Sequence, residues 1–226
     1  MSMIPKIIHY CWFGGKPKPQ KVLDYIDGWR RVNPDYEIKE WNETNFDVNS
    51  CHFTKESYAL GCYAFVSDVA RIYALIRDGG IYLDTDVEAI KPFDSLLNDE
   101  SFIGLETPYR LGTACIGAVK SCQWLMDFYS IYTNPDKHLI TKKGGISFAP
   151  NTVELTAFLG DRFPKNDGIR VYDVDVLCAK LYSHNGQLYK TERTVVIHHF
   201  AGSWINSGRR IYPLFERIRN LKVRYL

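Results

Sequence analysis

The chain has 226 residues, of which 46% are hydrophobic and 24% are charged, and its formal net charge at pH 7 is +2. This composition is that of an ordinary globular protein and excludes disordered and collagen-like chains. The small net charge gives no argument for a nucleic-acid partner, and we expect none. No apolar run approaches the roughly 18 residues that a membrane span requires. We expect a single domain over residues 1–226.

Six cysteines are scattered through apolar surroundings, and no CxxC pair is present. In a chain of this length the pattern indicates reduced thiols, although the even number leaves a disulfide framework open. The first residues, Met1 to Lys6, lack the apolar region and the cleavage site of a secretory signal. Both observations lead us to expect a cytoplasmic protein.

Apolar runs and turn residues divide the chain into candidate strands and helices. In the first half they predict a strand over residues 4–13, a helix over 20–32, a strand over 36–41, a mainly helical stretch over 57–78 and a strand over 81–84. In the second half they predict strands over 101–105, 114–119 and 194–198 and helices over 121–132 and 153–159. Gly79-Gly80 is interpreted as an αL cap of the long helical stretch. The alternation predicts an α/β fold with a largely parallel central sheet flanked by helices.

Two carboxylates, Asp84 and Asp86, stand at the end of the predicted strand over residues 81–84. Ligands of open α/β sheets bind outside the carboxyl ends of the strands, and Mg²⁺ and Mn²⁺ prefer carboxylate oxygens. One interpretation is a metal site for the diphosphate of a sugar nucleotide. A second is a DxD phosphohydrolase or phosphotransferase in which Asp84 accepts the phosphoryl group, and a third is a simple turn cap. The Val87-Glu88 that follows the pair disfavours the second interpretation.

Asp68 and Arg71 lie three residues apart in an otherwise apolar helical run, so they share one helix face. A helix that is apolar around most of its circumference is buried, and buried charges must be paired. The two side chains therefore either form a structural ion pair or bind a polar substrate. The helix pattern alone leaves both interpretations open.

The combined pattern of these segments resembles a known family. Ser-Asp-x-x-Arg at residues 67–71 and Gly-Gly-Ile-Tyr-x-Asp-x-Asp at residues 79–86 are similar to the nucleotide-sugar site of glycosyltransferase family 32, the DxD-containing sugar transferases. The resemblance implies a GT-A-like fold and a retaining transfer that uses Mn²⁺ or Mg²⁺ and a UDP- or GDP-sugar donor. It further implies that Asp68 and Arg71 hold the donor sugar, that Tyr82 lies near the nucleotide, and that Asp68, Arg71 and Asp86 carry the catalysis.

The resemblance extends to both ends of the chain. The segment Ile4 to Gly14 is similar to the first strand of the family. This implies that Trp12 stacks on the base, while the backbone at Ile8 and His9 contacts it. His198-His199-Phe200-Ala201-Gly202-Ser203-Trp204 is similar to a family signature. It implies that His199, favoured over His198 by its spacing to Gly202, joins Asp84 and Asp86 as a metal ligand, and that Ser203 and Trp204 contact the diphosphate.

The rest of the chain is less informative. Asn151 is interpreted as a helix N-cap in preference to a sugar contact. Glu106 follows the predicted strand over residues 101–105 and is a candidate to face an acceptor, but no specific feature of the sequence assigns it this role. A basic amphipathic segment over residues 207–226 is expected to dock on the domain, with peripheral contact to an anionic membrane as the alternative.

The resemblance implies that the acceptor is a saccharide or a lipid-linked saccharide, as in bacterial capsular polysaccharide or lipopolysaccharide synthesis. Two alternatives of other classes stay open. One is the phosphotransfer enzyme that uses Asp84, and the other is a nucleotide-sugar-binding protein without transfer activity.

Overall fold

The computed structural model describes residues 3–134, 149–160, 168–181 and 187–202. In chain order, the first elements are β1 (Ile7–Cys11), α1 (Gln20–Val32), β2 (Glu37–Trp41), α2 (His52–Ala59), α3 (Tyr63–Asp78), β3 (Gly80–Leu83), β4 (Val87–Ala89) and the 3₁₀ turn η1 (Asp94–Leu96). They are followed by β5 (Ser101–Thr107), β6 (Arg110–Ala118), α4 (Gln123–Thr133), α5 (Asn151–Leu159), β7 (Ile169–Tyr172), α6 (Val174–Leu177), β8 (Lys180–Leu181), β9 (Gln187–Leu188) and β10 (Val196–His198).

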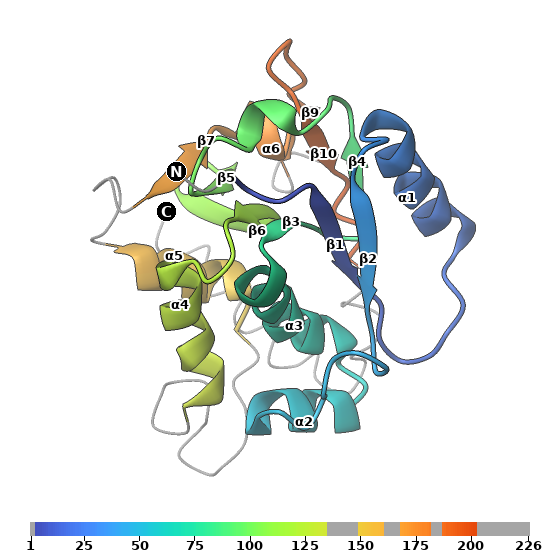
Figure 1. Cartoon of the computed structure of the whole chain (residues 1–226), viewed down its shortest axis with the longest axis vertical. Helices are drawn as coiled ribbons and strands as arrows, with labels where there is room; N and C mark the ends of the chain where they lie inside the picture. The colour runs from blue at the N-terminus through green and yellow to red at the C-terminus, as the bar shows by residue number, and fades with distance from the viewer. Residues whose placement is uncertain (1–2, 135–148, 161–167, 182–186, 203–226) are drawn as a thin grey trace.

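The centre of the fold is a six-stranded sheet in the order β2-β1-β3-β6-β5-β7. Neighbouring strands are parallel except at β6, which pairs antiparallel with both β3 and β5. The other strands of this sheet therefore run in one direction, which confirms the predicted α/β fold with a largely parallel sheet. A separate antiparallel pair joins β4 to β10, and Figure 1 shows this pair beside β1 and β2.

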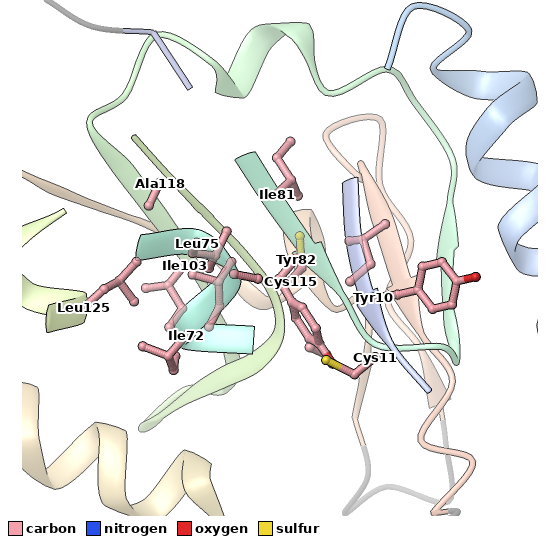
Figure 2. Packing of buried hydrophobic residues seen from close by; sticks show 14 of the residues in the cluster. Tyr10, Cys11, Ile72, Leu75, Ile81, Tyr82, Ile103, Cys115, Ala118 and Leu125 are labelled. Atoms are coloured by element: carbon pink, nitrogen blue, oxygen red, sulfur yellow. The ribbon is translucent and has the colours of Figure 1, made fainter. Parts of the chain in front are cut away.

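Helices cover both faces of the sheet. On one face, Trp41 packs edge-on against Tyr73 of α3. On the other face, Tyr10 packs against Trp29 of α1, whose indole N–H donates a hydrogen bond to the Val87 carbonyl of β4. Figure 2 shows Tyr10 directed away from the α3 side chains that fill the core. The first strand is thus buried on both faces, as its apolar sequence predicts.

Two findings concern more than one element of the fold. All six cysteines are free thiols, and five of them are buried. Among the described residues, no helix combines the length and the apolar composition that crossing a membrane requires.

The mainly helical stretch predicted over residues 57–78 is confirmed, and it comprises the end of one helix and the whole of the next. Helix α2 ends at Ala59, and α3 begins at Tyr63. Between them Gly61 has a φ of 70°, which glycine adopts readily because it lacks a Cβ atom. The apolar pattern continues through residues 60–62, so the pattern alone does not indicate where one helix ends and the next begins.

A two-glycine turn connects α3 to β3. Gly79 has a φ of 69° and a ψ of −168°, so the predicted αL cap is wrong and the residue lies in a region that only glycine occupies readily. A Cβ atom on Gly79 would lie 2.7 Å from the Lys120 nitrogen, and one on Gly80 would lie 2.6 Å from the Ile7 carbonyl oxygen. The turn therefore allows the helix to be followed at once by a central strand.

His9 links this turn to the sheet. Its Nε2 lies 2.7 Å from the Gly79 carbonyl oxygen, and its Nδ1 lies 3.0 Å from the Trp41 indole nitrogen. The indole N–H can only donate and the carbonyl can only accept, so the imidazole is neutral with its proton on Nε2. Burial lowers the pKa of His9 to about 4, although the Gly79 carbonyl acts in the opposite direction.

We predict that His9 makes the fold less stable in mild acid. Below pH 6.5 the unfolded chain protonates this imidazole, whereas the folded protein does so only near pH 4, so the free energy of unfolding falls as the pH decreases between these values. The shift corresponds to about 3 kcal/mol over this window. Urea unfolding of the wild type and of His9→Gln between pH 7.5 and 4.5 should show a shallower loss in the variant.

The matched control is His52→Gln, because His52 is exposed at the start of α2. This control should keep the wild-type pH dependence. Parallel curves for wild type and His9→Gln would contradict a buried neutral His9.

Candidate active site

The turn at Gly79-Gly80 directs β3 so that its carboxyl end lies beside the middle of α3. Asp84 follows the last residue of β3 and donates its backbone N–H to the Ala114 carbonyl of β6. A tight turn comes next, in which the Val87 N–H bonds to the Asp84 carbonyl oxygen. The two carboxylates predicted from the sequence therefore stand at a sheet edge, where ligands of α/β folds bind.

Arg71 is the buried cation at this edge. Its guanidinium lies 2.8 Å from an Asp68 oxygen and 3.4 Å from an Asp84 oxygen, and it donates to the Thr113 carbonyl at 2.9 Å. The guanidinium also lies over the Tyr82 ring, 4.7 Å from its centroid. The neighbouring carboxylates outweigh burial and raise the pKa of Arg71, so the side chain stays protonated.

Asp68 has a second partner that comes from far along the chain. The Asn151 side chain donates a hydrogen bond of 2.6 Å to its Oδ1. Burial raises the pKa of Asp68 to about 7, although Arg71 and Asn151 act in the opposite direction. A carboxylate with a pKa so far above its usual range is typical of a functional site rather than of a simple surface ion pair.

The side chain of Asn151 corrects one interpretation. Asn151 is the first residue of α5, and the N-cap position belongs to Pro150. Its amide donates to Asp68 and accepts a hydrogen bond from the Thr113 hydroxyl at 3.0 Å. The N-cap interpretation was therefore wrong, and this side chain lies among the candidate site residues.

Asp84, Asp86 and His198 form a group in which one ligand atom of each residue lies within 4.8 Å of the others. The His198 imidazole lies 3.3 Å from an Asp86 oxygen. Burial would lower the pKa of His198, but hydrogen bonds to Asp86 and Cys178 raise it to about 10. Burial would raise the pKa of Asp86, but His198 and the Ala201 N–H hold it below its usual value.

This donor set fits a hard divalent cation. Two carboxylates and one imidazole suit Mn²⁺ or Mg²⁺. The imidazole binds a metal only when it is neutral, so a cation here would replace the proton on His198. A second oxygen of Asp86 is held by the Ala201 N–H at 2.7 Å, which fixes the orientation of this carboxylate.

His199 does not join this group. Its Nε2 lies 2.8 Å from a Glu88 oxygen, and its ring stacks on Tyr25 with centroids 5.2 Å apart. Strand β10 pairs Ile197 with Glu88, and alternation along the strand places His199 on the Glu88 side. The expected preference for His199 over His198 is therefore corrected by the geometry, which brings His198 to the carboxylates.

The N-terminal residues assigned to the nucleotide lie along β1. Ile8 and His9 pair with β2 on one side and with β3 on the other, so the sheet already uses their backbone. Trp12 follows the strand at the same edge as Asp84, and its indole N–H donates to the Lys16 carbonyl at 2.6 Å. Trp12 is half-buried, which leaves part of its ring available for stacking.

The remaining assigned residues differ in how well the structure places them. Tyr82 is buried, and its hydroxyl donates to Asp84 at 2.8 Å. Ser203, Trp204 and the basic segment over residues 207–226 lie outside the described residues. The sequence interpretation missed Thr113, whose carbonyl and hydroxyl reach Arg71 and Asn151, because nothing in its local pattern distinguishes it.

The comparison with known families finds a match in the first half of the chain. Residues 19–103 match a family described as the glycosyltransferase sugar-binding region containing a DXD motif. Inositol phosphoceramide mannosyltransferase 1 of Schizosaccharomyces pombe is 30% identical over 114 residues, which cover 46% of this chain and 34% of that protein. The chain thus spans about a third of the length of this relative.

Solved structures agree on the fold. The PaToxG glycosyltransferase superposes with a TM-score of 0.50 at 19% identity, covering 72% of this chain and 70% of that one. A glycosyltransferase involved in glycosylation of the major capsid of PBCV-1 superposes with a TM-score of 0.51 at 13% identity, covering 92% of this chain and all of that one. The fold is therefore GT-A-like, and the resemblance to family 32 is confirmed over residues 19–103, which are similar to the DXD-containing sugar-binding region of glycosyltransferases.

Proposed function

We propose that the protein transfers a sugar from a UDP- or GDP-sugar to a hydroxyl of a saccharide or of a lipid-linked saccharide, with Mn²⁺ or Mg²⁺ and with retention of configuration. The observation that carries the proposal is the junction at Asp84. This residue connects the buried Asp68–Arg71 pair to the group of Asp86 and His198. A sugar-nucleotide donor needs polar side chains for its sugar, which the Asp68–Arg71 pair would supply. It also needs a cation for its diphosphate, which the group of Asp84, Asp86 and His198 would hold beside that pair.

The chemistry follows from the groups at this edge. A bond forms between the acceptor oxygen and the anomeric carbon, and the bond from that carbon to the diphosphate oxygen breaks. The acceptor proton passes to the released diphosphate. Arg71 supplies a fixed positive charge near the leaving oxygens, and charge stabilisation of this type is often the largest catalytic contribution. A bound cation would act as a Lewis acid on the same diphosphate.

The relatives support a particular range of substrates. The Schizosaccharomyces pombe relative is named for the transfer of mannose to inositol phosphoceramide, a lipid with a polar head. A GDP-mannose donor and a lipid-linked acceptor are therefore the first pair to examine, beside UDP-sugars and the saccharides of bacterial surface polysaccharides. Calorimetry with UDP, GDP and CDP, each with Mn²⁺ or with EDTA, tests the donor base.

We predict that Asp86→Ala abolishes metal-dependent nucleotide binding. The variant removes a charged partner from the group of Asp84 and His198, so Mn²⁺ should no longer raise the melting temperature of the nucleotide-containing sample. Turnover of the donor should fall by about 100-fold or more. The control is Asp27→Ala on α1, whose exposed carboxylate lies 2.7 Å from the exposed Arg30 guanidinium.

Wild-type metal dependence in Asp86→Ala would contradict the assignment of this group as the metal site. The phosphotransfer alternative predicts a different result, since Asp84 would then form a phosphoaspartate that beryllium fluoride mimics. Stabilisation by beryllium fluoride without any response to nucleotides would favour that alternative.

We predict that Arg71→Met lowers the stability of the folded protein by about 3–5 kcal/mol. The substitution leaves Asp68 and Asp84 without their shared cation in a buried site, and breaking such a pair is strongly destabilising. Urea unfolding without ligands measures the effect. The control is Arg77→Met on the same helix, where the exposed guanidinium lies 3.6 Å from Asp78 and the expected loss is below about 1 kcal/mol. Equal losses in the two variants would contradict a buried charge network.

A further inference from the structure

The loop over residues 12–18 follows β1 at the edge of the sheet that carries the candidate active site. Strand β1 pairs parallel with β3, with His9 opposite Tyr82. Continued by two residues, this register places Cys11 beside Asp84, about 4.8 Å away across the two strands. Trp12 is the next residue, and its ring is half-buried. The loop therefore begins beside the carboxylate that joins the two parts of the candidate site.

Both ends of this loop are held by hydrogen bonds and charge. The Trp12 backbone N–H donates to the Trp41 carbonyl at 2.9 Å, and its indole N–H donates to the Lys16 carbonyl at 2.6 Å. The Lys18 ammonium lies 2.6 Å from a Glu40 oxygen and 6.0 Å from the centroid of the Trp12 ring. The position of the Trp12 ring thus depends on how the loop is held.

Gly14, in the middle of the loop, is held by side chains from other elements. Its backbone N–H donates to Glu43 Oε1 at 2.6 Å, and the Tyr58 hydroxyl of α2 donates to the same oxygen at 3.0 Å. Tyr63, the first residue of α3, packs so closely that a Cβ atom on Gly14 would lie 2.2 Å from its ring. Gly14 also has a φ of 91°, so glycine alone fits this position readily.

Glu43 lies in a tight turn after β2 that is itself fixed by side chains. The Asn42 side-chain oxygen accepts the Thr44 backbone N–H at 2.9 Å, and the Asn45 amide donates to the Glu40 carbonyl at 2.8 Å. The Glu43 residue is exposed, yet its carboxylate accepts hydrogen bonds from two other parts of the fold. Its orientation is therefore defined, unlike that of an ordinary surface glutamate.

The order of the strands separates this loop from the contacts assigned to the donor sugar. Strand β3 lies between β1 and β6. Arg71 and Asn151 both bond to Thr113 of β6, so the proposed sugar contacts lie on the β6 side of Asp84, and the loop lies on the β1 side. A sugar nucleotide carries its sugar and its nucleoside at opposite ends of the diphosphate. A donor with its sugar on the β6 side therefore places its base near the loop.

We propose that Glu43 is a positioning residue for the donor nucleotide, and that it fixes the loop over residues 12–18 so that the exposed part of the Trp12 ring stacks on the base. The inference rests on the proposed sugar transfer and adds to it a residue that does not touch the substrate. A ring that is ordered in advance costs little free energy when the base binds, whereas a loop that must first be ordered weakens binding. Loss of Glu43 releases the Gly14 N–H and with it the middle of the loop. The defect should then be confined to ligands that carry a base.

The experiment measures binding to the full chain by calorimetry with Mn²⁺. The ligands are UDP or GDP, whichever the wild type binds more tightly, and inorganic diphosphate, which has no base. Glu43→Ala should lower the affinity for the nucleoside diphosphate by about three- to tenfold and leave that for inorganic diphosphate unchanged. Glu43→Gln should restore most of the loss, because an amide oxygen can accept the same two hydrogen bonds. The control is Glu37→Ala, exposed at the start of β2, which should match the wild type.

A double-mutant cycle tests whether Glu43 acts through Trp12. Trp12→Ala should lower the affinity for the nucleoside diphosphate by itself. Adding Glu43→Ala should then cause little further loss, because the ring that Glu43 positions is gone. A merely structural Glu43 would add its full effect to that of Trp12→Ala.

Three results would overturn the inference while the proposed function stands: unchanged nucleotide affinity in Glu43→Ala, equal losses for the nucleoside diphosphate and inorganic diphosphate, or additive losses in the double variant. The proposed function is decided separately by the metal-dependent nucleotide titration of the wild type. The absence of any binding in that titration would overturn both.

Discussion

The structure depends on one buried cation. Arg71 lies inside the protein with 5% of its surface exposed, and Asp68, Asp84 and the Thr113 carbonyl compensate much of its desolvation. These partners belong to a helix, to the segment after β3 and to β6. Any displacement of these elements separates the charges. The network therefore imposes the arrangement on which the candidate site is built, and Gly79-Gly80 makes that arrangement sterically accessible.

Asp84 connects this network to the candidate metal site. One side of this carboxylate contacts Arg71 and the Tyr82 hydroxyl, while the other side belongs to the group with Asp86 and His198. A change of charge at the Asp86–His198 group therefore acts on the Asp68–Arg71 pair through a single residue, Asp84. Electrostatic interactions between charges inside a protein are stronger than those in water because the local dielectric constant is low. Coupling between the two halves of the site follows from this geometry.

Much of the fold could be predicted from the sequence, for reasons that are local. Helix α1 has the predicted bounds because its amphipathic pattern is uninterrupted and Asn33-Pro34 ends it. Strand β3 and the carboxylates after it were predicted from an apolar run that begins after a two-glycine turn and ends at Asp84 and Asp86. The mainly helical stretch predicted over residues 57–78 is confirmed, but its apolar pattern does not record the break at Gly61, where the chain turns between α2 and α3.

The parts of the site that could not be predicted depend on long-range register. Asn151 reaches Asp68 across 83 positions, and no local pattern separates that role from helix capping. The choice between His198 and His199 depends on how β10 pairs with β4. The spacing to Gly202 was a poor guide to this choice, because the chain between these residues bends at Phe200, where φ is 52°.

Strand β6 contains a break in its register with β5, so residues 113–115 have no partner in that strand. The Thr113 carbonyl instead accepts a hydrogen bond from Arg71, and the Thr113 hydroxyl donates one to Asn151. The next carbonyl, that of Ala114, accepts the backbone N–H of Asp84. One antiparallel strand thus holds the two carboxylate partners and the cation of the network in place, and it does so through long-range pairing that no local sequence pattern records.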